Sequence, residues 1–406
     1  CISITFPINP LQPYTDRPCL ICNAENSCIE HCYSNKWHRV SLQFNFIWYS
    51  SLLIMDLPET FVEGFHDENE VRKMKYYTFG STGLKVSQLS LGTGAFSYFY
   101  GDVDEEECKK TVHEAIRRGI NYIDTGPWYG HGKSEEILGK CLEGIPRKAY
   151  YVATKVGRYE KDPLLMFDFS ATRSKRSIEE TLRRLKLDHV DVLQVHDIEF
   201  APSIDTILNE TLPALQDIVK EGRAKYIGIT GYPVTTLWEC IERSHVPINM
   251  ILSYCRLTMI DNTLNTFIPK LQAKNVGIVN AAAHSMGLLS NFGPPEWHPA
   301  GQEIKTACTE ARQYCKDKGV ELGKLALYYS LQQEGPATVL VGMKNRQLLD
   351  DNLQVFNDGL NPKEQAVYNH VLKIFEKLTV RHWENVEIEN YRKIMSGEAG
   401  GGGFFK

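Results

Sequence analysis

The sequence predicts an α/β fold. We expect a closed barrel of eight parallel strands, a β-hairpin before it and an extra helix after it. Two observations carry this prediction. Eight short apolar runs follow one another between residues 89 and 343, and stretches with helical spacing separate most of them. Such alternation indicates a parallel sheet that is covered on both faces, and eight units over about 280 residues match the size of a (β/α)8 TIM barrel.

Each expected strand is a short apolar run, and most runs end in a polar residue or a glycine. In chain order they are LSLGTGAF (89–96), NYIDTG (121–126), AYYVATKVG (149–157), VDVLQVHD (190–197), AKYIGITG (224–231), NMILSYC (249–255), VGIVNAAAH (276–284) and ATVLVGM (337–343). A doubly wound open sheet is the alternative, and it would place G-x-G-x-x-G at the first turn. Gly92 and Gly94 are present, but the third glycine is not at its offset. The count of eight therefore favours the barrel.

The expected helices show apolar residues at helical spacing and typical end signals. They cover residues 105–119, 177–187, 208–222 and 306–319. The segment 177–187 opens with Ser-x-x-Glu, a capping-box pattern, and the other three end in glycine. Before the barrel, YYTFGSTGLKVS (76–87) has the pattern of a hairpin. After the barrel, residues 362–378 predict the extra helix.

The chain divides into three parts by pattern. Residues 1–73 lack sustained periodicity and are interpreted as a disordered or extraneous leader; a zinc knuckle around Cys19 and Cys22 is the weaker alternative. Residues 74–380 form the expected barrel. Residues 381–406, which end in a glycine-rich stretch, are expected to be a flexible tail.

Composition limits the classes of function. The chain has 43% hydrophobic and 23% charged residues, as soluble globular proteins do. A net charge of -5 offers no electrostatic argument for nucleic acid or an anionic membrane as partner. The apolar run at 44–55 is too short to span a bilayer. The 11 cysteines are an odd number and mostly unpaired in spacing, which favours a reducing, cytoplasmic compartment.

Four polar residues lie where the active site of a barrel is expected, at the carboxyl ends of consecutive strands. Asp124 ends the second strand and Tyr129 follows it in the loop; Lys155 ends the third strand and His196 the fourth. Singly, each has a structural explanation: a cap or core salt bridge for the aspartate, loop packing for the tyrosine, and a snorkelling lysine or a core histidine for the others. Together they predict a site.

The chemistry of these groups fits together. A tyrosine with an ordinary pKa near 10 is a poor acid or base at neutral pH, and a neighbouring ammonium group lowers that pKa. Lys155 supplies the ammonium group, Asp124 its counter-charge, and His196 a hydrogen bond to a substrate oxygen. The set contains no activated nucleophile and no cluster of metal ligands. It therefore indicates a redox cofactor.

With these four residues in place, the sequence resembles the aldo-keto reductase superfamily. The motifs GSTGLKVSQLSLGTGAF, NYIDTGPWYGHGKSEEILG, VATKVGRY and VDVLQVHDIEF carry the resemblance, which runs from about Met74 to about Leu378. HDIEF, ILSYC, SMGLL and VLVGM are most similar to the L-galactose dehydrogenase branch. The resemblance implies that Tyr129 is the general acid/base, that Lys155 and Asp124 tune it, and that His196 orients the substrate.

The resemblance also implies cofactor contacts. Thr230 and Ser253 would lie near the nicotinamide carboxamide, and Met286, Gly287 and Leu288 near the pyrophosphate. The adenosine end would reach Gly342, Lys344, Asp351 and Asn352.

Three departures from the family pattern stand out: Thr230-Gly231 replaces Ser-Asn, Ala281 replaces an aromatic residue, and the basic pair that holds a 2′-phosphate is out of register. NAD is therefore expected in preference to NADP.

The functional hypothesis is an NAD(P)-dependent dehydrogenase that oxidises a cyclic aldose, such as L-galactose, at its anomeric carbon to a lactone. An NADPH-dependent aldehyde or ketone reductase is the first alternative, because the same groups catalyse both directions. A nucleotide-binding accessory subunit with little turnover is the second. The expected partner is a small sugar or carbonyl compound, with no metal, nucleic acid or membrane, and the expected state is a monomer.

Overall fold

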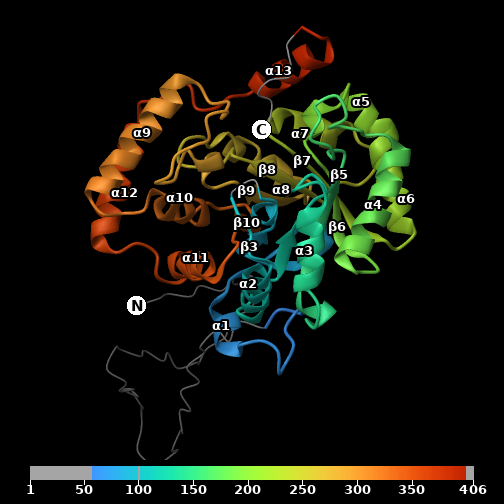
Figure 1. Ribbon diagram of the computed structural model, residues 1–406, viewed down its shortest axis with the longest axis horizontal. Coiled ribbons are helices and arrows are strands. Elements are labelled where there is room, and N and C mark those ends of the chain that lie inside the picture. The colour runs from blue at the N-terminus through green and yellow to red at the C-terminus, as the bar shows by residue number, and fades with distance from the viewer. Residues whose placement is uncertain (1–56, 99–100, 399–406) are drawn as a thin grey trace, which may run out of the picture. The chain divides into compact units, whose positions relative to one another are not determined.

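The barrel is the centre of the fold (Figure 1). The computed structural model describes residues 57–98 and 101–398. Eight parallel strands close in the order β10-β3-β4-β5-β6-β7-β8-β9. They are β3 (Leu89–Gly92), β4 (Tyr122–Asp124), β5 (Tyr151–Val156), β6 (Val190–Val195), β7 (Ala224–Gly231), β8 (Met250–Tyr254), β9 (Gly277–Ala281) and β10 (Thr338–Gly342). The predicted (β/α)8 barrel is confirmed, and each strand lies within one of the eight apolar runs.

Helices surround the strands (Figure 1). The principal ones are α2 (Glu105–Arg117), α3 (Lys133–Cys141), α4 (Ala171–Leu185), α6 (Leu212–Lys220), α7 (Val234–Arg243), α8 (Ile268–Ala273), α9 (Gln302–Asp317), α10 (Leu322–Leu331) and α11 (Arg346–Asp358). Helix α4 begins earlier than its pattern predicts, because the Ser170 side chain caps it by accepting a hydrogen bond from the Arg173 amide at 3.1 Å. The Ser-x-x-Glu at 177–180 therefore lies inside the helix. The short helix α5 (Ile204–Thr206) and a π-turn (Ile207–Thr211) precede α6.

The expected hairpin is present and closes the amino-terminal end of the barrel. Strands β1 (Tyr76–Thr78) and β2 (Lys85–Ser87) pair antiparallel. Between them Phe79 is fully buried and packs edge-on against Tyr122, with 5.5 Å between ring centroids. Gly277 at the start of β9 lies against this ring, and a Cβ atom at that position would stand 2.6 Å from it. The hairpin can close the barrel floor only because residue 277 has no side chain.

Residues 57–73, expected to belong to the leader, pack against the barrel. Helix α1 (Glu68–Lys73) buries Val71, and Asp67 pairs with Arg117 of α2 at 3.1 Å. The Asn121 side chain donates a hydrogen bond to Thr60 at 3.1 Å. The expected boundary at Met74 thus falls inside a packed segment. Residues 1–56, including Cys19 and Cys22, lie outside the described residues, so the interpretation of that part stays a prediction.

The carboxyl-terminal region differs from the expected single helix and flexible tail. Helix α12 (Pro362–Glu376) is the predicted extra helix, and it begins with a capping box between Asn361 and Glu364. A second helix, α13 (Val386–Met395), lies within the segment expected to be flexible. It packs against the Ile198–Phe200 turn after β6. Its Tyr391 lies edge-on to Phe200, with 5.5 Å between ring centroids.

The link between α12 and α13 is held by buried contacts. The ring of Trp383 stacks on Tyr232 with centroids 4.9 Å apart, and its backbone amide donates to the Tyr232 hydroxyl at 2.9 Å. The buried Arg256 pairs with Glu384 at 3.1 Å. These contacts order a segment whose own sequence is mostly polar. Within residues 57–98 and 101–398, no helix has the length and apolar character that a membrane crossing needs.

We expect Gly277→Ala to destabilise the protein by about 1–3 kcal/mol, because the added methyl group overpacks the site beside Phe79. Urea unfolding, followed by circular dichroism, measures the change. Gly301→Ala is the matched control, since Gly301 has an ordinary φ of -66° and a methyl group added there would meet no atom within 4 Å. Equal free energies of unfolding for the two variants would contradict the close packing of the barrel floor.

Candidate active site

The four predicted residues come together at the carboxyl end of the barrel. Asp124 is the last residue of β4, Lys155 lies near the end of β5, and His196 follows β6 directly. Asp124 and Lys155 are each 1% exposed and His196 is 5% exposed. Because the three strands are neighbours in the closed sheet, their side chains meet at one place.

Tyr129 reaches the same place through a tight loop. Its amide donates to the carbonyl of Gly126 at 3.1 Å, and its carbonyl accepts a hydrogen bond from the Ser134 amide at 3.1 Å. Gly130 and Gly132 have φ angles of 64° and 95°, the left-handed region that glycine adopts most easily. These contacts fold the loop back, so that the tyrosine ring lies 4.8 Å from the Lys155 ammonium nitrogen.

The buried ammonium group of Lys155 is surrounded by acceptors. It donates to the Asp124 carboxylate and to the carbonyl of Thr125, the latter at 2.7 Å. The second oxygen of Asp124 accepts a hydrogen bond from the Gln194 side-chain amide at 2.7 Å. Gln194 pairs in register with Lys155 across β5 and β6. Both side chains thus reach the same carboxylate from one layer of the barrel interior.

The electrostatics of the lysine and tyrosine follow from burial and charge. Burial works against a charged ammonium group, but Asp124 holds the pKa of Lys155 above its ordinary value. Burial raises the pKa of the Tyr129 phenol, while Lys155 opposes this shift. Lys155 thus acts on the tyrosine in the expected direction, and burial outweighs it. At neutral pH the tyrosine is protonated and the lysine charged.

His196 is neutral at neutral pH. Burial lowers its pKa to about 3. Its ring lies edge-on to Tyr129, with 5.8 Å between centroids and 71° between ring planes. Its Nε2 atom is 3.6 Å from the carboxylate of Asp197, which pairs with Arg158 at 2.7 Å. A neutral imidazole beside the tyrosine can donate one hydrogen bond to a substrate oxygen.

Two of the expected nicotinamide contacts lie on adjacent strand ends. Thr230 belongs to β7, and its hydroxyl accepts a hydrogen bond from the Asp197 amide at 3.0 Å. Ser253 belongs to β8 and pairs in register with Gly231. Its hydroxyl is buried and has no hydrogen-bond partner among the described residues. Tyr254 pairs in register with Ala281, so an aromatic ring from β8 lies beside the position where β9 offers only a methyl group.

The expected pyrophosphate segment has an unusual backbone. Ser285, Met286 and Gly287 have φ angles of 47°, 51° and 93°, all left-handed. The turn is held on one side by the Tyr254 hydroxyl, which donates to the sulfur of Met286 at 2.8 Å. Leu288 is fully buried beneath it. The amides of Gly287 and Leu288 donate to carbonyls within the turn, those of His284 at 3.0 Å and Ser285 at 3.2 Å.

The expected adenosine contacts lie at the end of β10 and on α11. Gly342 pairs in register with Gly92, and Lys344 donates to the carbonyl of Asp102 at 3.0 Å. Asp351 and Asn352 lie in the first half of α11. The Asp351 carboxylate accepts a hydrogen bond from Gln347 at 2.9 Å. These positions follow one another along one side of the barrel mouth, through β10 and the helix after it.

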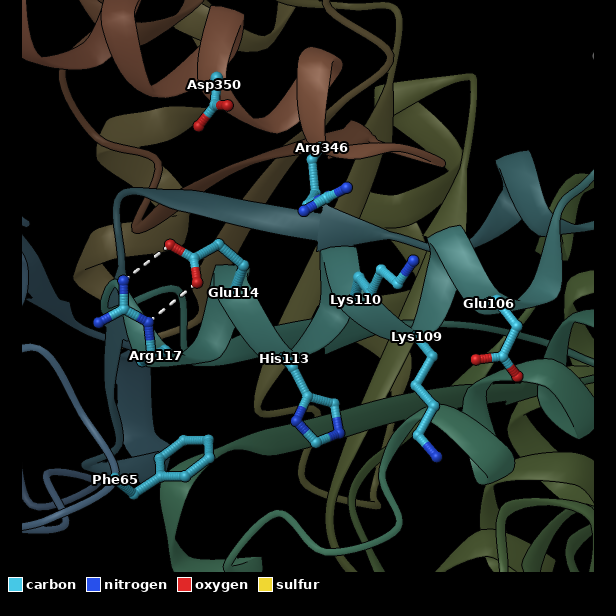
Figure 2. A pocket seen from close by; sticks show the side chains of 9 residues that line it. All are labelled: Phe65, Glu106, Lys109, Lys110, His113, Glu114, Arg117, Arg346 and Asp350. Atoms are coloured by element: carbon cyan, nitrogen blue, oxygen red, sulfur yellow. Dashed lines mark hydrogen bonds and ion pairs between the residues drawn. The ribbon is translucent and has the colours of Figure 1, made fainter.

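A wide surface hollow lies elsewhere, between α2 and α11 (Figure 2). Lys109, Lys110 and Glu114 from α2 line it together with Arg346 and Asp350 from α11. Its lining includes none of the four predicted catalytic residues, and its charges are mixed. We therefore assign the site to the barrel mouth and not to this hollow. Across the described ranges, no group of three His, Cys, Asp or Glu side chains is arranged to hold a metal ion.

Comparison with known proteins decides the family. The Aldo/keto reductase family model matches residues 88–372. The chain belongs to the aldo/keto reductase family. It is therefore an oxidoreductase of a family that uses NAD(P).

Relatives in this family include several sugar dehydrogenases. The chain is 42% identical to L-galactose dehydrogenase of Arabidopsis thaliana over 76% of its own length and 97% of the relative's. It is 30% identical to D-arabinose 1-dehydrogenase of Saccharomyces cerevisiae, over 74% and 94%. Among solved structures, an aldo-keto reductase from Bacillus halodurans in its holo form matches with a TM-score of 0.58 and 28% identity, covering 73% of this chain and 96% of that one.

Sequence reasoning missed three residues of this candidate site. Gln194 lies inside an apolar strand, and only its place two residues before His196, on the same face of β6, could have indicated it. Tyr254 lies on β8, one strand away from Ala281, where the family pattern has an aromatic residue. Arg158 lies in the VATKVGRY motif, but its pairing with Asp197 depends on how two loops fold.

We expect Gln194→Leu to lower kcat about tenfold, because the second Asp124 oxygen would lose its neutral donor inside a buried network. Steady-state kinetics measure the loss, and the pH dependence of kcat should shift with it if Asp124 no longer holds Lys155 in place. Gln333→Leu is the control, since among the described residues its side-chain amide donates only to the carbonyl of Tyr329, near the carboxyl end of α10. Unchanged kcat and pH profile in Gln194→Leu would contradict a positioning role.

Proposed function

We propose that this aldo-keto reductase oxidises an aldose, such as L-galactose, at its anomeric carbon to the lactone. One observation carries the proposal: a tyrosine, a charged lysine–aspartate pair and a neutral histidine converge at the mouth of a barrel whose sequence is 42% identical to an L-galactose dehydrogenase. A second relative with a sugar substrate in its name, the D-arabinose 1-dehydrogenase, supports the same class.

In this proposal Tyr129 moves the proton. The anomeric hydroxyl of the sugar donates a hydrogen bond to the tyrosine oxygen and gives up its proton there as the C–H bond is broken. Lys155 stabilises the phenolate that accepts this proton, and Asp124 keeps the lysine charged although it is buried. His196 donates a hydrogen bond to the same sugar oxygen and fixes its direction. A bound nicotinamide would supply the acceptor for the hydride that leaves the anomeric carbon.

The residues present fit a nicotinamide dinucleotide. The buried Ser253 hydroxyl lacks a partner among the described residues, as expected for a group that would bond the carboxamide. Thr230 lies at the adjoining strand end. The segment at Met286, Gly287 and Leu288 would lie along the pyrophosphate, and the adenosine end would reach Gly342, Lys344, Asp351 and Asn352. Tyr254 would offer its ring beside Ala281.

NAD is the proposed cofactor in preference to NADP. Recognition of a 2′-phosphate needs cations that are available to it. Arg346 is engaged by Glu107 of α2 at 3.0 Å, and Lys344 donates to a backbone carbonyl. Figure 2 shows Arg346 directed toward α2. Both basic side chains that follow β10 are thus directed to neighbours within the chain.

Carbonyl reduction is the second candidate, and one observation favours it. Because burial keeps the pKa of Tyr129 high, the tyrosine holds its proton at neutral pH and can donate it to a carbonyl oxygen. The same groups then act in reverse. The direction in the cell depends on the supply of substrate and of reduced cofactor.

A panel of aldoses with NAD⁺ or NADP⁺ tests the substrate class. We expect L-galactose or a closely related aldose to reduce the cofactor, with NAD⁺ giving the higher kcat/KM. The absorbance of the reduced nicotinamide is the measurement, and propanal with NADH and NADPH is the comparison. The proposal fails if no aldose reduces either cofactor while simple aldehydes are reduced readily.

We expect Tyr129→Phe to lower kcat by at least about 100-fold, because the group that carries the proton is removed. Nucleotide affinity, measured by fluorescence titration, should change little. Tyr77→Phe is the matched control, since Tyr77 is exposed on the barrel floor side. A parallel loss of nucleotide affinity and kcat would instead mean that Tyr129 is structural.

Oxidation should speed up from neutral to alkaline pH. The base form of Tyr129 is needed for oxidation, and its raised pKa keeps the fraction of that form small at neutral pH. His196 contributes no step in this range, because its pKa is about 3. The profile of kcat should be measured with anomerically deuterated sugar alongside, to verify that chemistry limits the rate. A flat profile with a full isotope effect would argue against the tyrosine.

A further inference from the structure

We infer that Asp197 determines substrate specificity by binding the hydroxyl group on the carbon next to the reacting C–O carbon. The inference rests on the proposed function, in that it takes Tyr129 and His196 to hold the reacting oxygen. The ligand class is a polyhydroxy compound with neighbouring oxygens, as in an aldose or a 2-hydroxyaldehyde. Asp197 follows the strand end that carries His196, but the proton-transfer chemistry gives it no task.

The backbone brings the Asp197 carboxylate to the mouth. Asp197 has a φ of 50°, so the chain turns sharply after β6 before the Ile198–Phe200 turn. The side chain thereby comes back beside His196, with 3.6 Å between the carboxylate oxygen Oδ2 and the imidazole Nε2. That separation is longer than a hydrogen bond. The carboxylate is adjacent to the substrate-orienting group without being bonded to it.

Asp197 is held through both its side chain and its backbone. Arg158 donates to Oδ2 at 2.7 Å, and the guanidinium of Arg158 lies 4.1 Å from the ring centroid of Trp128, in the loop that carries Tyr129. The backbone amide of Asp197 donates to the hydroxyl of Thr230 at 3.0 Å. Arg158 thus links the carboxylate to the loop that carries Tyr129, and the amide contact fixes the backbone of Asp197 relative to the end of β7.

One oxygen of this carboxylate retains the capacity to accept a strong hydrogen bond. Arg158 and His196 lie against the oxygen Oδ2. Among the described residues, the contact to the other oxygen, Oδ1, is a long one, 3.5 Å from the Thr230 hydroxyl. Burial opposes its charge, but the guanidinium of Arg158, which donates a hydrogen bond to it, holds the pKa of Asp197 below its ordinary value, so it is an anion at neutral pH. An anionic acceptor that is only partly covered, with 15% of its side chain exposed, is suited to a hydroxyl donor.

The position matches the geometry of a sugar. Neighbouring oxygens on adjacent carbons lie about one hydrogen-bond length apart. A substrate oxygen bonded to His196 Nε2 therefore brings its neighbouring hydroxyl toward the carboxylate that flanks the same nitrogen. A substrate without this hydroxyl would lack the donor that the anionic carboxylate can accept, which is a basis for discrimination.

The test compares substrates that differ only in the neighbouring hydroxyl. For the oxidation, the pair is L-galactose and 2-deoxy-L-galactose; for the reduction, it is glyceraldehyde and propanal. The wild-type enzyme should favour the hydroxylated member by about 10- to 100-fold in kcat/KM, as for a hydrogen bond to a charged group. In Asp197→Asn this ratio should fall by about tenfold, mainly through KM of the hydroxylated member.

Two further variants keep the test decisive. Asp197→Glu retains the anion and should keep part of the preference, which covers the case in which Asp197→Asn does not fold. Asp205→Asn is the matched control: its exposed carboxylate pairs with Arg243 on the outer helices, and its ratio should equal that of wild type. Thermal melting and nucleotide titration verify that each variant is intact.

The outcomes separate this inference from the proposed function. A wild-type ratio near one, or an unchanged ratio in a folded Asp197→Asn, overturns the inference while leaving aldose oxidation in place. If no aldose is oxidised, yet glyceraldehyde is favoured over propanal and Asp197→Asn removes that preference, the inference stands and the proposed function fails.

Discussion

The buried ion pair between Lys155 and Asp124 is the interaction on which the site depends. Both side chains are 1% exposed, so each charge would be costly without the other. The sheet register explains how they meet. Asp124 pairs with Ala153, two residues before Lys155 and on the same face of β5. The long lysine side chain spans this offset, and Gln194, level with the lysine, completes the coordination of the carboxylate.

The charge of this pair affects the two neighbouring groups, Tyr129 and His196. The lysine carries the positive charge that a phenolate needs, and the folded-back loop holds Tyr129 4.8 Å away. His196 stays neutral because burial disfavours a second cation beside the first. A second ion pair, Arg158 with Asp197, lies closer to solvent and joins the tyrosine loop to the end of β6. The two pairs thus form a deep layer that faces Tyr129 and an outer layer beside His196.

The parts that sequence could predict are those set by local pattern. Apolar runs locate strands because a strand covered on both faces must be apolar, and polar residues that break such runs at their carboxyl ends must converge in a barrel. Gln194 could not be predicted, because its partner Asp124 lies 70 residues away in the sequence. The apolar pattern of its own strand does not mark it as a site residue. Helix α13 could not be predicted for a similar reason. The segment before it is held by contacts of Trp383 and Glu384 with Tyr232 and Arg256, which lie far away in the sequence. The segment at 57–73 has too few apolar residues to show a period, yet Thr60 and Asp67 bind the barrel through polar contacts.

The hairpin beneath the barrel has a consequence for the order of events during turnover. Phe79 and its neighbours fill one end of the barrel, so any ligand that reaches Tyr129 must arrive and leave through the other. If the dinucleotide occupies the strand ends at Ser253 and Gly342, it lies beneath the sugar. If two stacked ligands share a single entrance, the ligand that binds second must leave first. Nucleotide exchange would then wait for the departure of the product.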